Sequence, residues 1–391
     1  MLALLAPGQG AQKPGMLTPW LDLPGVESRL RWLSAVSGLD LVRLGTTADT
    51  EEIRDTAVTQ PLIVAFGLVA AAELELADVT VTAGHSIGEV TAAALAGVFG
   101  PEAAVALARL RGRAMAAACE QAPTGMSAVL GGDPAEVLAR LDELGLTPAN
   151  RNGAGQVVAA GPVDALRELA AAPPRRARIA PLSVAGAFHT AAMAPAEEEL
   201  AAVADGVAVR DPERLLLSNA DGTAVASGHE AVKRLVHQVT RPVRWDLCQA
   251  TLRDLGATAV LELPPAGTLA GLARRELPGV EILALKTPDN LHAARALLAR
   301  LAHAGQAEHT PDWRVVVAPV GGTFHPVGLG EGSEVRAGSP LGTVRTKREE
   351  HQVNAAYHGV LVEWLLEDGD LVAPGEPLAR LYPGDADGTG A

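Results

Sequence analysis

The sequence predicts an α/β protein with a parallel sheet, a smaller inserted α/β unit and a separate C-terminal β domain. Short apolar strands alternate with long Ala- and Leu-rich helical stretches from residue 1 to about residue 300, which is typical of an α/β domain with parallel strands. Residues 126–185 depart from this alternation. After residue 312 the composition changes to short β-type runs separated by glycines.

The first region consists of strands that lead through tight turns into helices. Residues 1–6 are apolar and are followed by Pro7 and Gly8; because the run carries no basic residue, we interpret it as a buried strand and not as a signal peptide. The later elements expected here are a strand, a turn, two helices and a final strand, at residues 79–83, 84–88, 89–98, 102–119 and 258–263.

The inserted unit follows the order strand, helix, strand, strand, helix, strand. Asp133 and Pro134 are typical of an N-cap and a first helical turn, and the turn-rich residues 152–155 join the two middle strands. This order is that of a ferredoxin-like unit. We therefore expect a ferredoxin-like subdomain at about residues 122–186.

The C-terminal region contains an internal repeat at a shift of 37 residues. The matched pairs are Ala318 and Ala355, Gly322 and Gly359, Leu329 and Leu366, Gly332 and Gly369, Val335 and Val372, Gly338 and Gly375, Pro340 and Pro377, and Leu341 and Leu378. Two similar half-units joined by a hairpin predict a small β-barrel or sandwich. We divide the chain into a first domain at 1–301, a linker at 302–312, a β domain at 313–382 and a flexible tail at 383–391.

The composition excludes several classes of function. Hydrophobic residues make up 48% and charged residues 20% of the 391 residues, which is the balance of a folded soluble protein. A formal net charge of −14 argues against nucleic acid or an acidic membrane as a partner. No run approaches the length of a membrane span. Cys119 and Cys248 are too few for a disulfide framework or a structural zinc site, so we expect no metal and a reducing cytoplasm.

A candidate nucleophile lies in Gly84-His85-Ser86-Ile87-Gly88, between a predicted strand and a predicted helix. A G-x-S-x-G turn at such a junction holds its serine at a sharp elbow, at the strand end where open α/β sheets bind ligands. The helix N-terminus behind it favours developing negative charge. The alternative is an inert turn.

A serine hydroxyl needs a base before it can act as a nucleophile. His189 follows the last strand of the inserted unit, and a base at the boundary between two subdomains would lie over a cleft. A helix-capping or core histidine is equally consistent with the spacing.

A series of short motifs runs in order through about residues 1–300. They are Pro7 to Gln12 (PGQGAQ), Thr59-Gln60-Pro61, Gly84 to Glu89 (GHSIGE), Arg111-Gly112-Arg113, Asn152 with Gln156-Val157-Val158, Gly186 to His189 (GAFH), Gln238 with Arg241-Pro242-Val243, and Glu262 to Pro265 (ELPP). Together they resemble the malonyl-CoA:acyl carrier protein transacylase family of type II fatty acid synthesis, whose fold also forms the acyltransferase domain of polyketide synthases. The resemblance implies a hydrolase-like parallel-sheet core with the inserted ferredoxin-like subdomain.

The resemblance also implies the catalytic roles. Ser86 is then the nucleophile and His189 its general base, and Gln238 resembles the residue that orients the histidine, with an amide where hydrolases often place Asp. The backbone N–H groups of Gln9 and Ile87 resemble an oxyanion hole.

Arg111 resembles the arginine that binds the malonyl carboxylate, which a guanidinium can hold through two parallel hydrogen bonds. It falls on an apolar helix face, and an arginine there needs a buried anion. The other residues of that face are Ala104, Leu107, Ala108, Met115 and Ala118. A structural salt bridge is the alternative. Arg109 and Arg113 are expected to point into solvent.

Substrate choice is expected to depend on Ile87 and Phe188, which look like the malonyl-selective pattern of the family. A bulky Phe188 would crowd an α-methyl branch, although one methyl group gives only about 1–3 kcal/mol of discrimination. Met115 and Asn152 are candidate pocket residues, and Asn152 is equally consistent with a hairpin turn.

The resemblance implies transfer of malonyl from malonyl-CoA to a holo acyl carrier protein through a malonyl-Ser86 ester, with no bound cofactor. Carrier proteins of this class are acidic, so a local basic patch is expected, and Arg175, Arg176 and Arg178 are one candidate. Such a run is more often a solvated face. A fatty acid pathway and a polyketide pathway both remain open.

Residues 314–382 resemble the biotinyl/lipoyl carrier domain, a barrel-sandwich hammerhead of two half-repeats with a modified lysine on the connecting hairpin. The usual spacing from Gly359 leads to Arg348, which cannot form the amide, and Lys347 would require a slip of one residue. We therefore expect no biotin or lipoyl attachment and a docking role toward a protein partner.

Two other functions compete with malonyl transfer. An acyl hydrolase or thioesterase on the same fold would not need Arg111. A non-catalytic scaffold would not need Ser86, His189, Gln9 and Arg111 together.

Overall fold

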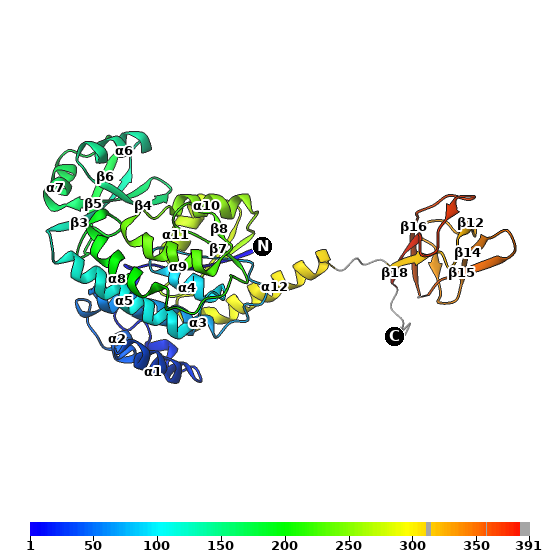
Figure 1. The fold of residues 1–391 in the computed structure, drawn as a ribbon, viewed down its shortest axis with the longest axis horizontal. Helices are drawn as coiled ribbons and strands as arrows, with labels where there is room; N and C mark the ends of the chain where they lie inside the picture. Colours follow the sequence, from blue (N-terminus) through cyan, green and yellow to red (C-terminus); the bar gives the residue numbers. More distant parts are fainter. Residues whose placement is uncertain (310–313, 357, 384–391) are drawn as a thin grey trace. The chain divides into compact units, whose positions relative to one another are not determined.

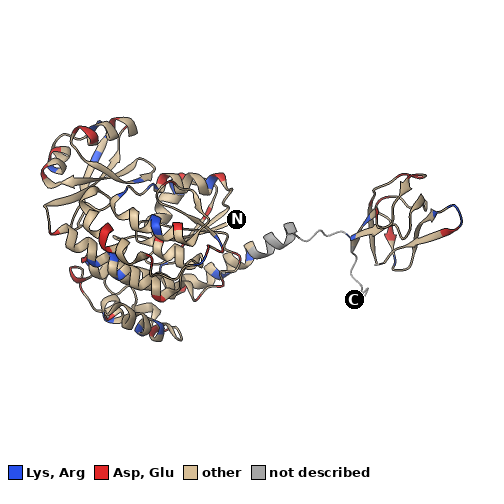
Figure 2. Ribbon diagram, viewed as in Figure 1, with Lys and Arg blue, Asp and Glu red and all other residues tan. Residues whose placement is uncertain are grey.

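The computed structural model describes residues 1–309, 314–356 and 358–383. It divides into two compact units, Met1–Ala302 and His303–Ala391, and each is described by itself (Figure 1). Acidic and basic residues are interspersed along the helices of the first unit (Figure 2).

The core of the first unit is a six-stranded sheet in the order β10-β9-β1-β2-β7-β8. All neighbouring strands pair in parallel except β7 and β8, which are antiparallel, so the sheet is mixed. The strands are β1 (Leu2–Ala6), β2 (Val81–Gly84), β7 (Leu215–Leu217), β8 (Ala224–Val225), β9 (Ala259–Glu262) and β10 (Glu281–Ala284). The strands predicted at residues 1–6 and 79–83 correspond to β1 and β2, and the helix predicted at residues 89–98 corresponds to α4 (Gly88–Leu95).

Helices cover both faces of this sheet because successive strand residues point to opposite faces. Leu2 and Leu4 pack in the larger apolar cluster with α1, α3, α4, α5, α9 and α12, whereas Ala3 and Leu5 pack with α10 and α11. The helices are α1 (Val26–Ser37), α2 (Leu41–Thr46), α3 (Thr56–Ala71), α4 (Gly88–Leu95), α5 (Pro101–Cys119), α8 (Ala194–Ala204), α9 (Gly228–His237), α10 (Trp245–Asp254), α11 (Thr268–Glu276) and α12 (Leu291–His309). Short 3-10 turns are η1 (Thr18–Trp20), η2 (Glu52–Arg54), η3 (Ala191–Met193), η4 (Gln238–Thr240) and η5 (Pro288–Asn290).

The inserted subdomain has the predicted strand and helix order. Its antiparallel sheet has the order β4-β5-β3-β6, and Asp133 caps α6 as expected, by accepting from the N–H groups of Ala135 and Glu136. The elements are β3 (Thr124–Gly131), α6 (Pro134–Glu143), β4 (Thr147–Gly153), β5 (Gln156–Pro162), α7 (Val163–Ala171) and β6 (Ala177–Pro181). Ala154 and Gly155 form the β4–β5 turn with φ of 47° and 68°, the left-handed values of a tight hairpin.

The second unit contains two antiparallel four-stranded sheets, β11-β18-β16-β13 and β15-β14-β12-β17. The predicted repeat relates them, because a shift of 37 residues takes Gly322, the start of β12, to Gly359, the start of β16, and exchanges the two sheets strand for strand. A shared apolar core that includes Phe324, Leu341 and Leu361 joins the sheets. The strands are β11 (Arg314–Val317), β12 (Gly322–Pro326), β13 (Glu334–Val335), β14 (Pro340–Arg345), β15 (Glu350–Asn354), β16 (Gly359–Trp364), β17 (Leu371–Val372) and β18 (Pro377–Pro383).

Several predicted boundaries require correction. The predicted linker begins within a helix, because α12 continues to His309; its last residues include Ala302, Ala304 and Ala307, which favour helix. Residues 310–313 of the linker and 384–391 of the tail lie outside the described residues, and Pro383 is the last residue of β18. Helix α4 ends at Leu95 and not at Val98, because the chain turns at Gly97 with φ of 89°.

Within the described part of the chain, every helix is too short or too polar to cross a lipid bilayer.

Candidate active site

Ser86 lies in a strained turn between β2 and α4. Its φ of 53° is in the left-handed region, which a residue with a side chain seldom adopts. The flanking glycines permit the close approach of neighbouring chain segments: a Cβ on Gly84 would lie 2.0 Å from the carbonyl of Gly88, and one on Gly88 would lie 2.2 Å from the carbonyl oxygen of Ala6. The predicted G-x-S-x-G elbow is therefore present and sterically dependent on both glycines.

The structure brings His189 to Ser86. The Nε2 atom of His189 lies 2.7 Å from Ser86 Oγ, and its Nδ1 atom lies 2.7 Å from the carbonyl oxygen of Gln238. Because a carbonyl only accepts, Nδ1 carries the proton and Nε2 is the bare nitrogen that can accept from the serine. Burial, followed by the charge of Arg111, lowers the pKa of His189 to about 3. The imidazole is therefore neutral near pH 7, the form that a base requires.

Gln238 holds the histidine through its backbone, and the expectation that its side-chain amide takes the place of an Asp needs correction. The side chain points away from His189: its Oε1 atom accepts from Arg111 Nη2 at 2.8 Å, and its Nε2 atom donates to Glu89 and to Asn219 Oδ1. The reason lies in η4, whose turn directs the carbonyl of Gln238 toward the imidazole and the side chain toward the buried polar groups.

The two backbone N–H groups expected to form an oxyanion hole are those of Gln9 and Ile87. Gln9 lines the same cavity as Ser86, and Ile87 is the next residue in the chain; neither N–H has a hydrogen-bond acceptor among the residues that the structure describes. Ile87 precedes α4, so its N–H belongs to the electropositive end of a helix. The side chain of Gln9 donates to Thr56 Oγ1 at 3.2 Å, which fixes the loop after β1.

Arg111 is buried, with 3% of its surface exposed, and its hydrogen-bond partners are neutral. Nη1 donates to Gln60 Oε1 and Nη2 to Gln238 Oε1, both at 2.8 Å, and Nη2 also lies 3.4 Å from Ser86 Oγ. No described Asp or Glu lies within salt-bridge distance of it, so the alternative of a structural salt bridge is wrong, although the charge of the nearby Glu89 acts to raise its pKa. Burial lowers the pKa of Arg111 to about 10, which leaves it a cation at neutral pH.

The two arginines beside it differ from each other. Arg113 is exposed and lies 3.6 Å from Glu199, as expected for a solvated side chain. Arg109 is only partly exposed and donates to the carbonyl oxygen of Ala57 at 2.8 Å, so the expectation of a solvated Arg109 is wrong. Close packing of α5 against α3 accounts for this, because it places the Arg109 guanidinium at the first turn of α3.

The Ser86 hydroxyl opens into a cavity of about 220 Å³ between the core and the inserted subdomain. Met115, Asn152 and Phe188 line the same cavity as Ser86 and His189. Asn152 belongs to β4 and not to the hairpin turn, and its Oδ1 atom lies 2.8 Å from His85 Nε2. The two alternatives for Asn152 are thereby resolved in favour of a position in the cavity wall.

Three polar residues of the site received no role from the sequence. Gln60 and Glu89 occur in the motifs that carry the resemblance, but nothing in the motifs indicates their contacts. Asn219 follows the buried strand β7, and a polar residue at the carboxyl end of a parallel strand is a signal that could have identified it. Its Oδ1 atom accepts from the N–H of Ser86 at 2.8 Å.

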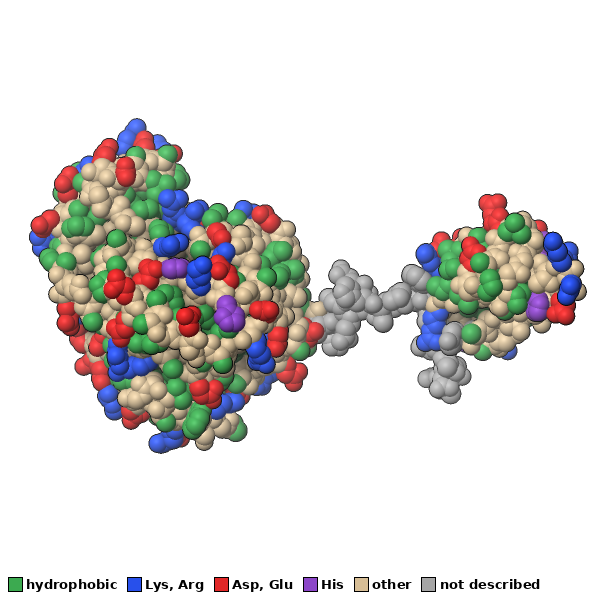
Figure 3. Space-filling view, viewed as in Figure 1, with side chains coloured by type: hydrophobic (Ala, Val, Ile, Leu, Met, Phe, Trp, Pro, Cys, Tyr) green, Lys and Arg blue, Asp and Glu red, His purple; other side chains and the backbone are tan. Residues whose placement is uncertain are grey.

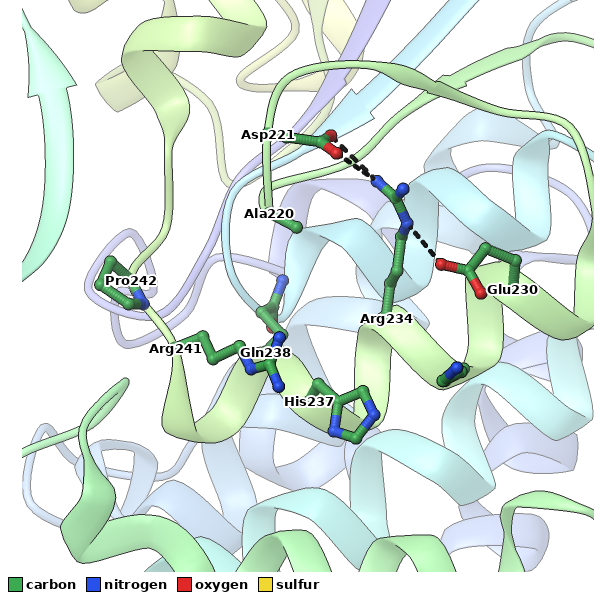
Figure 4. Close-up of a pocket in the computed structure, with 9 residues that line it drawn as sticks. Ala220, Asp221, Glu230, Arg234, His237, Gln238, Arg241 and Pro242 are labelled. Carbon is green, nitrogen blue, oxygen red and sulfur yellow. Dashed lines mark hydrogen bonds and ion pairs between the residues drawn. The ribbon is translucent and has the colours of Figure 1, made fainter.

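A second hollow of about 420 Å³ is lined by Gln238 together with residues of α9 and of the loop after β7 (Figure 4). Arg234 is held there between Asp221 at 2.9 Å and Glu230 at 2.9 Å, and Arg241 lies beside Gln238. Neither Ser86 nor His189 lines this hollow. Of these two hollows, Ser86 and His189 line the first.

Residues 4–303 match the model of the acyl transferase domain. The chain belongs to the acyl transferase family. Curated relatives in this family include the malonyl CoA-acyl carrier protein transacylase of Mycobacterium tuberculosis, which is 57% identical over 296 residues, or 74% of this chain and 98% of the relative. The corresponding protein of Escherichia coli is 31% identical over 311 residues, or 75% of this chain and 99% of the relative.

Solved structures in the family show the same fold. The crystal structure of the Mycobacterium tuberculosis transacylase superposes with a TM-score of 0.74 and covers 75% of this chain and 99% of its own length. A malonyl-transacylase in complex with a type II polyketide acyl-carrier protein is 30% identical, has a TM-score of 0.72 and covers 76% of this chain and 99% of its own length. The family thus accounts for the first unit and not for the second.

Proposed function

We propose that this protein is an acyl-carrier-protein S-malonyltransferase that moves malonyl from malonyl-CoA to the phosphopantetheine thiol of a carrier protein through an ester on Ser86. The observation that carries the proposal is Arg111. A buried guanidinium with neutral partners, 3.4 Å from the nucleophile, provides a site for a carboxylate on the acyl group. A hydrolase of simple acyl groups has no use for this cation.

The first half-reaction forms the malonyl-serine ester. The Ser86 oxygen attacks the thioester carbonyl carbon while its proton passes to His189 Nε2. The N–H groups of Gln9 and Ile87 receive the developing oxyanion. The carbon–sulfur bond then breaks, and the departing coenzyme A sulfur takes the proton from His189.

The second half-reaction reverses these steps with a different thiol. The phosphopantetheine thiol gives its proton to His189 Nε2, and its sulfur attacks the ester carbonyl carbon. The bond to the Ser86 oxygen breaks, and that oxygen regains the proton. Since the same imidazole accepts the proton of Ser86 in the first half-reaction and the proton of the phosphopantetheine thiol in the second, no further base is needed. Malonyl-CoA is the substrate, and no other cofactor enters these steps.

Selectivity for malonyl is assigned to Phe188 and Ile87. Phe188 lines the cavity beside His189, where its ring would crowd an α-methyl branch. The expected preference over methylmalonyl is modest, because one methyl group changes binding by about 1–3 kcal/mol.

Mass spectrometry tests the proposal. The protein mixed separately with malonyl-, methylmalonyl- and acetyl-CoA should gain a malonyl group most rapidly, and a holo carrier protein should then remove that group. Ser86→Ala should gain none. Malonate on the Ser86→Ala variant would contradict the assignment of the nucleophile, and free malonate without carrier loading would indicate a hydrolase.

The proposal also includes a surface to which the acidic carrier protein would dock. Arg175, Arg176 and Arg178 are all exposed, at the beginning of β6, and remain available to an acidic partner. Basic side chains also lie along the hollow between the subdomain and the core (Figure 3). A reducing cytoplasm is the compartment that suits both substrates.

For residues 314–382 the proposal is a biotinyl/lipoyl-like domain of the barrel-sandwich hammerhead type that docks to a protein partner. The exchange of its two sheets by the repeat supports this. Lys347 and Arg348 are the two central residues of the β14–β15 turn, in which the Thr346 N–H donates to the Glu349 carbonyl at 2.8 Å. Both side chains are exposed at the tip of the turn, so a slip of one residue would not change which of them is accessible for modification. The absence of attachment stays a prediction.

A further inference from the structure

Glu89 is a buried carboxyl group directly behind the nucleophile, and the mechanism above does not use it. It lies in the first turn of α4 and is 3% exposed. Its Oε1 atom accepts from the N–H of Asn219 at 3.1 Å, and its Oε2 atom accepts from Gln238 Nε2. Burial raises its pKa to about 7, against the lowering effects of the Asn219 N–H, the Ser218 and Gln238 side chains and the charge of Arg111.

Glu89 holds Asn219 by its backbone N–H and Gln238 by its side-chain amide, and the side chains of both residues contact the backbone of Ser86. Asn219 Oδ1 accepts from the Ser86 N–H at 2.8 Å, and Gln238 Nε2 donates to the Ser86 carbonyl at 3.2 Å. Asn219 Nδ2 also donates to the carbonyl of Gly84 at 2.7 Å. A strained residue persists only where its surroundings fix it, and these contacts fix the strained Ser86.

The same carboxyl group sets the orientation of the Gln238 amide. The amide nitrogen faces Glu89, and the amide oxygen faces Arg111 at 2.8 Å. A reversed amide would place oxygen against carboxylate and nitrogen against guanidinium, so the charges at its two ends allow one orientation only. The backbone of this glutamine supplies the carbonyl that orients His189.

We propose that Glu89 is a positioning residue of the transfer reaction, whose two carboxyl oxygens hold Asn219 and Gln238 and through them align Ser86, His189 and Arg111. This rests on the proposed function. Both oxygens are needed because each receives an N–H. A glutamine at this position has one acceptor oxygen, so its NH₂ group would face either the Asn219 N–H or the Gln238 amide nitrogen.

The experiment compares Glu89→Gln and Glu89→Asp with the wild type in single-turnover loading of Ser86 by malonyl-CoA. We expect Glu89→Gln to lower the acylation rate about 10- to 100-fold, since a buried donor loses its acceptor and the reacting groups lose alignment, with little change in the KM for malonyl-CoA. Glu89→Asp keeps both acceptor oxygens and should retain more activity. Glu73→Gln is the matched control, because Glu73 is a largely buried carboxylate that pairs with Arg29 outside the site.

A double-mutant cycle separates positioning from a general loss of stability. If Glu89 acts in part through Gln238, the variant with both Glu89→Gln and Gln238→Met should lose less loading rate than the product of the two single losses. Multiplied losses in the double variant, or a Glu89→Gln rate within threefold of the wild type, would overturn the inference. Should Glu89→Gln not fold, the cycle is run with Glu89→Asp, and the same two outcomes decide it.

Labelling of Ser86 by a fluorophosphonate tests the positioning role of Glu89 without depending on malonyl transfer. The probe needs the serine, the histidine and the oxyanion hole but no malonyl group. If the wild type does not load malonyl, the proposed function fails, while slower labelling of Glu89→Gln still supports the positioning role. Unchanged labelling with unchanged loading would overturn it.

Discussion

Arg111 is a charged side chain that is almost completely buried, and its hydrogen-bond partners are the amide oxygens of two glutamines. A guanidinium that is desolvated and bonded to two amide oxygens keeps its full positive charge available to an incoming anion. Gln60 and Gln238 fix the direction of the fork without neutralising it. This arrangement is what the proposed role of Arg111 in binding the malonyl carboxylate requires.

Substitution of Arg111 should separate malonyl from acetyl transfer. Arg111→Ala is expected to lower Ser86 loading from malonyl-CoA by about 100-fold or more, because the charge-assisted pair with the carboxylate is lost. Loading from acetyl-CoA should change much less. Rates of acyl-enzyme formation with the two donors measure this, and an equal loss for both would show that Arg111 only supports the fold.

His189 should make the folded protein sensitive to acid. Its pKa is about 3 when folded and about 6.5 when unfolded, so between these values the unfolded chain binds more protons and stability falls as pH falls. Glu89 acts in the opposite direction: its folded pKa of about 7 lies above the unfolded value, so its contribution is lost as pH rises through 7.

Replacement of His189 by Gln isolates the first effect, because Glu89 is present in both proteins. When the pH falls from 7 to 4.5, the wild type should lose about 2 kcal/mol more unfolding free energy than His189→Gln loses, because only the wild type has this buried imidazole. Urea unfolding at both pH values measures the difference. A constant gap between the two proteins would mean that the imidazole is not held neutral.

At the scale of elements, the turn from β2 into α4 and the position of η4 against it create the site. The turn is encoded locally by Gly84 and Gly88, whose contacts leave no room for a Cβ. The approach of η4 is not local: Gln238 contacts the carbonyl of Ser86 across 152 residues of chain. Local sequence therefore predicts the elbow, and packing of the sheet and helices brings His189 and Arg111 to it.

The arginines at the start of β6 give a prediction for carrier docking. A variant with Gln at Arg175, Arg176 and Arg178 should raise the KM for the carrier protein several-fold and leave malonyl-Ser86 formation unchanged, because steering charges lie outside the reaction cavity. A variant with Gln at the exposed Arg31, Arg54 and Arg300 makes the same change in net charge and is the control. Equal kinetics in the two variants would remove this surface as a docking site.

At the scale of the whole molecule, the family match ends where the first unit ends. Relatives such as the Mycobacterium tuberculosis transacylase are covered over 98% of their length by 74% of this chain. The second unit, with its own apolar core, is therefore an addition to a complete acyl transferase domain.

A shortened protein of residues 1–309, which keeps α12, should form malonyl-Ser86 at the rate of the full chain within about twofold, because every described residue of the cavity lies before residue 303. The full chain should show an intact mass with no biotinyl or lipoyl addition. A mass increment on Lys347 would refute the prediction for the second unit, and a large loss of loading in the shortened protein would show that this unit serves the first.

The sequence by itself determined the order of elements, the ferredoxin-like insertion, the two-part repeat and the serine elbow, because each follows from periodicity, turn residues and steric rules that act over a few residues. Only the tertiary structure decided that Gln238 uses its carbonyl, that Asn152 faces the cavity, that Arg109 is not solvated, and that Glu89 and Asn219 belong to the site. These depend on contacts between segments far apart in the chain, such as Ser86 and His189 at a sequence separation of 103, and such contacts follow from packing of the whole sheet.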